Sequence, residues 1–364
     1  MANKQTTERD LFVKLGSRSY PITVTLGALN SIPEAVGGLT NAKKCMLISN
    51  PTVMELYGNR LTHSLVAEGW EVISGIVDDD EKAKSLDSIC KLWDLAAQHH
   101  FERWTPFLAL GGGVVGDIAG FAAATYKRGV PLIQIPTTLL AQVDSAIGGK
   151  NGINHALGKN LIGTFYQPKA VVIDPITLKT LPRRELVCGM AEVIKYGVID
   201  DVVLFTFVEK QLERILDVDL DIIEEAIKQS VAVKCKIVSL DETEVGLRAV
   251  LNFGHTVGHA LESVTGYKLF HHGEAVAIGM AEESRMAVRM GVFSASEAER
   301  LIALLQRAGL PTSIPKNISL DSLLPALQQD KKNREGKVSV VMPKQLGEVS
   351  VYQIDGREAL RLLA

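Results

Sequence analysis

Histidines are concentrated in one short stretch of this sequence. Half of the eight histidines fall between positions 255 and 272, and His255, His259 and Glu262 would share one face of a helix at i, i+4 and i+7. One carboxylate with two imidazoles is the usual ligand set of a catalytic divalent metal, whereas a closed structural site would use cysteines. Spacing alone leaves the ligands open among these histidines, His271, His272 and several acids. A surface histidine patch is the alternative interpretation.

Two further segments are suited to binding phosphate. The run GGGVVGD (111–117) follows a buried type of strand and opens a helical pattern, so its backbone could approach a pyrophosphate at a helix N-terminus. Lys150 and Lys159 each stand in a glycine-containing segment, which predicts two phosphate-binding loops. The alternatives are a tight strand-to-helix turn and ordinary solvated lysines.

Charged residues also recur in the helical second half. Glu192 and Lys195 in AEVIKYG are three residues apart, a spacing that usually indicates a surface ion pair on a helix. The stretch VKCKIVSLDETEVGLR contributes Lys234, Glu244 and Arg248, either to a site or to a solvated helix face with a charged loop.

The elements that must position these residues follow two patterns. Nearly all-apolar runs predict parallel strands covered on both faces, with helices between them, at 45–49, 72–77, 107–110, 132–135 and 171–174. An opening hairpin or pair of edge strands is expected in FVKL and YPITVTLG. From about residue 180, apolar residues recur with a period of 3.6 and predict helices over 184–196, 221–239, 251–264, 274–290 and 295–308. Strand patterns return near Lys337 and Glu348. The sequence therefore predicts a doubly wound α/β half followed by a mainly helical half.

Composition excludes several classes of protein. The 364 residues are 46% hydrophobic and 22% charged, unlike disordered, collagen-like or coiled-coil chains. A net charge of −3 provides no basic field for nucleic acid or an anionic membrane. The four cysteines are far apart and predict reduced thiols, and the apolar windows are too short to span a membrane. With no targeting signal recognised, a soluble cytoplasmic protein is expected.

Taken together, ten motifs resemble the 3-dehydroquinate synthase family in order and spacing over nearly the whole chain. They are LALGGGVVGDIAGF, YKRG, PTTLLAQVDSAIGGK, GKNLIGTFYQP, TLKTLP, GMAEVIKYG, DETEVGLR, LNFGHTVGHALE, HHGEAVAIGM and QDKKNREGKV. The resemblance implies an α/β fold with a Rossmann-like, doubly wound NAD-binding domain at 1–180. It also implies a mainly α-helical metal- and substrate-binding domain at 181–364, an active site in the cleft between the domains, and a homodimer.

The resemblance also implies a role for individual residues. One divalent metal, Zn²⁺ or Co²⁺, would be bound by Glu192, His255 and His272. The NAD⁺ contacts would be Asn50, Asp79, Glu81, Lys84, Gly113, Val114, Val115, Gly116, Asp117, Thr137, Thr138, Thr177, Leu178 and Thr180, with Asp144, Lys150 and Lys159 shared between cofactor and substrate. Substrate and catalytic groups would be Asn160, Lys195, Lys234, Glu244, Arg248, Asn252, His259 and one of Lys331 and Lys332. Arg128 would reach the neighbouring subunit's site.

The reaction implied is the conversion of 3-deoxy-D-arabino-heptulosonate 7-phosphate to 3-dehydroquinate and phosphate, the second step of the shikimate pathway of aromatic amino acid biosynthesis. It would proceed by transient oxidation with NAD⁺, phosphate elimination, re-reduction and intramolecular aldol closure. His259, Asn252 and Asn160 would position the phosphate together with lysines. Arg248 and Lys234 would bind the carboxylate.

Three alternatives compete with this interpretation. A sister sugar phosphate cyclase would use the same cofactors on another sugar, but valiolone-type relatives tend to have Asp and Pro at the positions of Asn252 and His259, and inosose-type relatives tend to lack the GGK at 148–150. A metal-dependent alcohol dehydrogenase would have less need of so many lysines. A catalytically inactive sensor would have no need of an open metal site.

Overall fold

The structure is a computed structural model, and it describes residues 11–329 and 337–364. The chain forms two compact units. The first contains the described residues up to Thr137 together with Ser145–Thr177, and the second contains Thr138–Asp144 and the described residues from Leu178 onwards. The sequence predicted one boundary after residue 180, whereas the second unit also includes the short segment 138–144. Among the described helices, none is long and apolar enough to cross a membrane.

A seven-stranded sheet forms the first unit, in the order β1-β2-β9-β6-β5-β3-β4. β1 pairs antiparallel with β2, and every other pairing is parallel. Each predicted parallel strand and the opening strand pair are present, which confirms a doubly wound α/β fold. The sheet strands are β1 (Leu11–Val13), β2 (Tyr20–Val24), β3 (Lys44–Ser49), β4 (Glu71–Ile76), β5 (Phe107–Gly111), β6 (Leu132–Pro136) and β9 (Ala170–Ile173).

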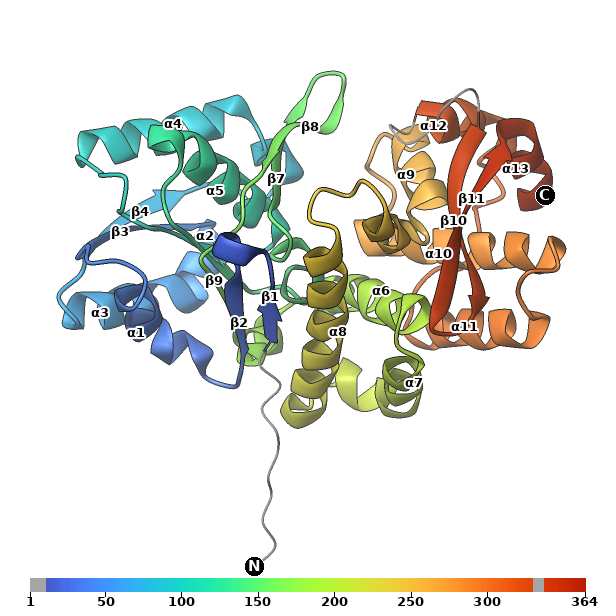
Figure 1. Cartoon of the computed structure of the whole chain (residues 1–364), viewed down its shortest axis with the longest axis horizontal. Coiled ribbons are helices and arrows are strands. Elements are labelled where there is room, and N and C mark those ends of the chain that lie inside the picture. The colour runs from blue at the N-terminus through green and yellow to red at the C-terminus, as the bar shows by residue number, and fades with distance from the viewer. Residues whose placement is uncertain (1–10, 330–336) are drawn as a thin grey trace, which may run out of the picture. The chain divides into compact units, whose positions relative to one another are not determined.

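Helices cover both faces of this sheet (Figure 1). α4 and α5 pack on one face, where Leu92 and Ile118 contact the core, and α1 and α3 pack on the other with Ile32 and Leu65. β5 lies in the middle and is buried on both sides, as its all-apolar sequence predicts. The helices are α1 (Ile32–Gly37), α2 (Pro51–Val53), α3 (Asn59–Ala67), α4 (Leu86–Gln98) and α5 (Gly113–Thr125).

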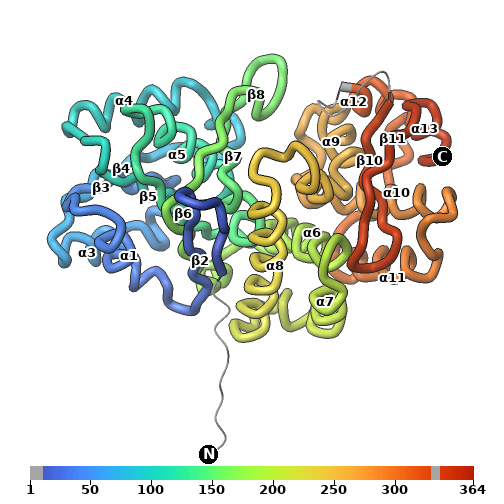
Figure 2. Tube along the Cα trace, viewed as in Figure 1, coloured from blue at the N-terminus to red at the C-terminus, as the bar shows by residue number. Residues whose placement is uncertain are grey.

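The two predicted phosphate-binding loops are instead a hairpin. β7 (Lys150–His155) and β8 (Gly158–Phe165) pair antiparallel, with Lys150 opposite Phe165, and form a separate two-stranded sheet (Figure 2). The prediction of loops here was wrong, because these glycine-containing segments pair as antiparallel strands. Gly152 and Gly163 face each other across the strands at a distance that leaves no space for a Cβ atom.

The second unit is mainly helical, as predicted, with one two-stranded antiparallel sheet of β10 and β11. α6 and α10 are its most buried helices. Nearly every residue of α6 between Leu186 and Ile199 is buried, as are most residues of α10 between Gly273 and Ala287. The elements are α6 (Arg183–Ile199), α7 (Val202–Leu216), α8 (Leu220–Leu240), α9 (His255–Val264), α10 (His272–Arg289), α11 (Ala295–Arg307), α12 (Leu324–Gln329), β10 (Lys337–Gln345), β11 (Glu348–Asp355) and α13 (Gly356–Leu363).

α9 and α10 approach each other through glycine. The predicted helix over 251–264 begins only at His255, because Gly254 before it has φ +80° and a short 3₁₀ turn ends at Asn252. A Cβ atom at Gly279 would lie 1.8 Å from the Gly254 carbonyl oxygen, and one at Gly258 would lie 3.0 Å from the Ala275 carbonyl oxygen. The helices that carry the clustered histidines are therefore packed backbone to backbone.

We expect Gly279→Ala to destabilise the protein although alanine is the better helix former by about 1 kcal/mol. The added methyl group must push α9 and α10 apart, and overpacking of this kind costs roughly 1–3 kcal/mol. Urea unfolding measures the change. Gly37→Ala in α1 is the control, because a Cβ atom there meets nothing within 4 Å. Equal stability of the two variants would contradict the close packing.

Glu283 on α10 also holds the start of α9. Its carboxylate is fully buried and accepts hydrogen bonds from the backbone N–H groups of Gly254 at 2.6 Å and Val257 at 3.2 Å. Burial raises the pKa of Glu283 to about 8, although these N–H donors favour the charged form and oppose the rise.

This raised pKa predicts a pH-dependent stability. Folding favours the protonated carboxyl, so its stabilising contribution is complete below the ordinary pKa of 4.5 and is lost as pH rises through about 8. The slope is at most about 1.4 kcal/mol per pH unit. We expect Glu283→Gln to remove this slope, because the amide does not titrate. Parallel curves of unfolding free energy for the two proteins between pH 5 and 9 would contradict the prediction.

Candidate active site

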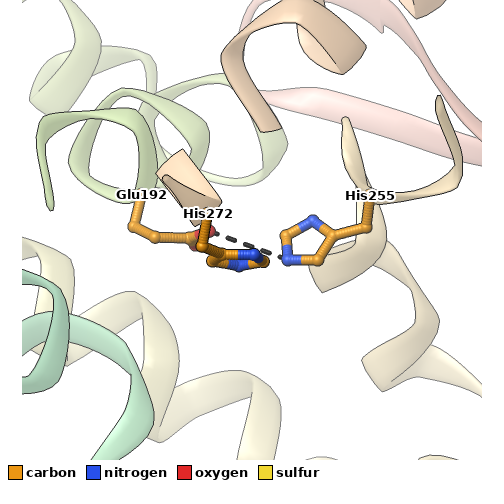
Figure 3. A group of neighbouring side chains, drawn as sticks. All are labelled: Glu192, His255 and His272. Atoms are coloured by element: carbon orange, nitrogen blue, oxygen red, sulfur yellow. Dashed lines mark ion pairs between the residues drawn. The ribbon is translucent and has the colours of Figure 1, made fainter. Parts of the chain in front are cut away.

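Three side chains of the second unit converge in a group able to bind a metal ion (Figure 3). Glu192 comes from α6, His255 is the first residue of α9 and His272 the first of α10. One potential ligand atom from each residue lies within 4.8 Å of the others. The structure thus brings together the three residues that the resemblance implied, although they are far apart in sequence.

The imidazole ring of His255 has a defined orientation in this group. Its Nδ1 lies 3.2 Å from the Phe253 carbonyl oxygen, and its Nε2 lies 3.7 Å from Oε1 of Glu192. Burial, together with the positive charge of Lys195, holds the pKa of His255 well below its usual range. The imidazole is therefore neutral at physiological pH, which is the form that coordinates a metal.

Glu192 is fully buried and also contacts the ammonium group of Lys195, which is 1% exposed. The expectation of a surface ion pair was wrong, since both partners lie inside the helical unit. Within the described residues, neither carboxylate oxygen of Glu192 has a hydrogen-bond partner. A buried carboxylate with one oxygen against Lys195 and the other 3.7 Å from an imidazole nitrogen fits a divalent cation.

The other two histidines of the cluster differ from each other. His271 lies 3.0 Å from Glu185 through its Nδ1 and is in neither of the two metal-competent groups found among the described residues. His259 belongs to the second of those groups, which it forms with Glu262 and His272. The rings of His255, His259 and His272 are all within 5.9 Å of one another, centroid to centroid.

An ion pair between a buried lysine and a partly exposed aspartate lies in the same unit. Lys234 on α8 contacts Asp144 at 2.5 Å, and the hydroxyl of Tyr196 donates a hydrogen bond to the same carboxylate oxygen at 2.6 Å. Burial alone would raise the pKa of Asp144, but the charges of Lys234 and Lys195 hold it well below its usual range. Burial lowers the pKa of Lys234; Asp144 opposes that change, and Arg248 and Lys195 add to it. Lys234 and Lys195 thus both act on the Asp144 carboxylate, and Arg248 adds a further positive charge near Lys234, an arrangement suited to binding an anion.

The segment after α8 places three more of the expected residues. Arg248 is 1% exposed, and its guanidinium donates a hydrogen bond to the Glu242 carbonyl. Asn252 donates from its side-chain amide to Glu244 at 2.8 Å. Glu244 has φ +61°, so the loop holds it in a backbone conformation that is uncommon for a side-chain-bearing residue.

In the first unit, the glycine-rich turn meets a buried lysine. The turn lies between β5 and α5, where Gly113 is the first helical residue. Lys84 is 8% exposed and contacts Asp117 of this helix at 2.7 Å and Glu81 at 3.5 Å. Burial disfavours its charge, but the two carboxylates outweigh that effect and raise the pKa of Lys84. Glu81, Lys84 and Asp117, all expected at the cofactor, are therefore brought together.

The other expected residues lie at several places. Asn50 follows β3 and caps α2 by accepting from the Val53 N–H at 2.8 Å. Thr137 follows β6 and is buried, and the Thr177 hydroxyl donates to the Asp174 carbonyl at 2.8 Å. Exposed positions are occupied by Asp79, Arg128, Lys150, Asn160 and Thr180, and intermediate ones by Val114, Gly116, Thr138 and Lys159; Val115 and Leu178 are buried. Lys331 and Lys332 lie outside the described residues.

Sequence reasoning missed Tyr196 as part of the site. Its hydroxyl bridges Asp144 and the Val143 carbonyl oxygen, the latter at 3.0 Å. The sequence signal for Tyr196 was its position directly after Lys195 in AEVIKYG. A tyrosine on a buried helix, however, more often fills the core than takes part in a site. Glu283 lies in an ordinary helical stretch, MAEES, where no motif marks it.

Comparison with known proteins identifies the family of the chain. Two family models match, described as 3-dehydroquinate synthase N-terminal over residues 74–188 and 3-dehydroquinate synthase C-terminal over residues 189–333. A 3-dehydroquinate synthase of Nostoc punctiforme is 49% identical over 341 residues, which cover 93% of this chain and 94% of the relative.

Solved structures share the fold. A 2-epi-5-epi-valiolone synthase from Streptomyces hygroscopicus subsp. jinggangensis 5008, with NAD⁺ and Zn²⁺ bound, is 29% identical with a TM-score of 0.87, covering 94% of this chain and 95% of that one. A 2-deoxy-scyllo-inosose synthase complexed with carbaglucose-6-phosphate, NAD⁺ and Co²⁺ has a TM-score of 0.85 at 24% identity, covering 97% of this chain and 98% of that one, a likeness that shows the fold alone.

The parallel-sheet unit and the helical unit with its Glu-His-His group define a protein with the fold of the sugar phosphate cyclases. Within that class, the family models that match both halves and the Nostoc relative all carry the name 3-dehydroquinate synthase. The chain belongs to the 3-dehydroquinate synthase family.

Proposed function

We propose that the chain converts 3-deoxy-D-arabino-heptulosonate 7-phosphate to 3-dehydroquinate and phosphate, with NAD⁺ and one divalent metal, Zn²⁺ or Co²⁺, as cofactors. The observation that carries the proposal is the convergence of Glu192, His255 and His272 in the unit that also holds Lys195, Lys234 and Arg248 as buried cations. Membership of the 3-dehydroquinate synthase family supports the choice of substrate.

The second unit supplies the metal ligands and the anion-binding groups. Glu192, His255 and His272 hold the metal, which when bound supplies Lewis-acid stabilisation of a developing alkoxide. Lys234 and Arg248 bind the substrate carboxylate. Lys234 is buried beside the Asp144 carboxylate, and Arg248 is buried in the segment after α8. His259 and Asn252 position the phosphate, a role that Asn160 of the first unit shares. Glu244 orients Asn252 through their 2.8 Å hydrogen bond, and Lys195 holds a proton beside Glu192.

NAD⁺ binds to the first unit at the carboxyl ends of the parallel strands. Asn50, Gly113 and Thr137 each follow a central strand, β3, β5 and β6, where open α/β sheets bind nucleotides. The N-terminus of α5 accommodates the pyrophosphate because its first N–H groups are not bonded within the helix. Lys84, held by Asp117 and Glu81, places an ammonium group near this helix.

We also propose that the protein is a cytoplasmic homodimer in which Arg128 reaches the partner's site. Arg128 is exposed, and it and Lys127 have φ of +63° and +46°. Two successive residues in this region are strained, so the surrounding structure imposes their conformation. The molar mass in solution tests the dimer.

The test of function is release of inorganic phosphate from the heptulosonate phosphate, with catalytic NAD⁺ and added Zn²⁺ or Co²⁺, while absorbance of NADH is followed. We expect phosphate release that a chelator abolishes and no lasting NADH. Lasting NADH would mean a dehydrogenase. No phosphate release from this substrate, together with turnover of sedoheptulose 7-phosphate or glucose 6-phosphate, would mean a sister cyclase.

A further inference from the structure

We propose that Glu262 is a positioning residue that orients the His272 imidazole for the metal and does not itself bind the metal. The proposal rests on the proposed metal site of Glu192, His255 and His272. Glu262 shares the helical face of His255 and His259, but neither the resemblance nor the proposed reaction gives it a role.

The contact between the two side chains defines the orientation. Nδ1 of His272 lies 3.5 Å from Oε1 of Glu262, and the Glu262 side chain is 8% exposed. A buried carboxylate requires a charged or hydrogen-bonding partner, and the imidazole provides one. With Nδ1 directed at Glu262, Nε2 of His272 is the nitrogen left to bind the metal.

His255 has the same arrangement with a different acceptor. Its Nδ1 is directed at the Phe253 carbonyl oxygen and its Nε2 at Glu192. Histidine ligands of metals commonly donate their second ring N–H to a carboxylate or a backbone carbonyl, which fixes the tautomer and the direction of the ring. Here one ligand has a carbonyl and the other a carboxylate in that position.

The structure also contains a competing group able to hold a metal, formed by His259, Glu262 and His272. Two observations favour Glu192 as the carboxylate ligand. Glu192 is fully buried, and its Oε2 contacts Lys195 while its Oε1 faces the imidazole of His255, whereas Oε1 of Glu262 is directed at Nδ1 of His272. The Glu192 group also uses His255, whose Nε2 is directed at that carboxylate, whereas His259 of the competing group is exposed.

The experiment is a Co²⁺ titration of the full-length protein after removal of metal, followed by the visible absorption of bound Co²⁺ and by competition with a chelator. We expect Glu262→Gln to bind Co²⁺ about 10- to 100-fold more weakly than the unaltered protein, with an altered absorption spectrum. Glu262→Asp, which retains the charge, should recover part of the affinity. Glu282→Gln is the control, because Glu282 is a buried carboxylate on α10 that pairs with Arg285.

Each outcome has one meaning. If Glu262→Gln binds Co²⁺ like the unaltered protein, or is weakened only as much as Glu282→Gln, the positioning role is wrong while the metal site stands. If Glu262→Gln and His259→Ala abolish binding and Glu192→Gln does not, Glu262 is a ligand and the proposal is overturned. If the unaltered protein itself fails to bind Co²⁺, the proposed metal site fails and the role of Glu262 fails with it.

Discussion

His272→Ala is expected to lose bound metal and turnover together. The substitution removes one of three ligand residues from a group whose potential ligand atoms lie within 4.8 Å of one another. The remaining Glu192 and His255 cannot complete a catalytic site, which needs three protein ligands. Because stabilisation of developing negative charge by a metal is worth several kcal/mol, we expect turnover to fall roughly 1,000-fold or more. Metal content and phosphate release are measured on the same preparation.

The neighbouring histidine provides a matched control. His271 immediately precedes His272 but contacts Glu185 at 3.0 Å. His271→Ala should therefore keep its metal and most of its turnover while making the same chemical change one residue away. A His272→Ala variant that retained full activity without metal would remove the basis of the site.

Asp144→Asn is expected to destabilise the protein by roughly 3–5 kcal/mol at pH 7, because it leaves a buried ammonium group without its anion. The positive charges of Arg248 and Lys195 near Lys234 would then no longer be offset by Asp144. The loss should be smaller at pH 9, since burial already lowers the pKa of Lys234 and a neutral amine tolerates the site. Urea unfolding at the two pH values measures both the loss and its pH dependence.

The same helix supplies the control for this prediction. Lys236 on α8 pairs with Asp200 at 2.7 Å, and the lysine side chain is 58% exposed. Asp200→Asn removes an equivalent charge from an exposed pair and should change stability by no more than about 1 kcal/mol. Equal effects of the two substitutions would show that Asp144 and Lys234 are not paired inside the folded protein.

Patterns along the sequence predicted the architecture because burial on both faces of a parallel strand leaves a local signature. β3, β5 and β6 were recognised from their apolar runs, and α10 from its period of 3.6. The hairpin of β7 and β8 was missed because its glycines and asparagines are typical of loops. Backbone hydrogen bonds between its strands, which no side-chain pattern encodes, form it.

Part of the site could also be predicted from a local pattern in the sequence. Spacing placed His255 and His259 on one face, since both lie within a single helix. It could not add Glu192, which comes from another helix, and the resemblance to a family supplied that residue. Nor could spacing show whether Lys195 faces the core, because a pair at i and i+3 looks the same on either side of a helix.

Neither unit of this protein is a continuous piece of the sequence. The segment 138–144 belongs to the second unit although the chain on both sides belongs to the first, and a Cβ atom at Gly189 would lie 2.7 Å from Leu139. That segment also carries Asp144, the partner of Lys234 and Tyr196. The helical unit therefore cannot be exchanged between relatives as a cassette cut at one junction. A chimaera must transplant 138–144 with it, and during synthesis this early segment can meet Gly189, Tyr196 and Lys234 only after they have been made.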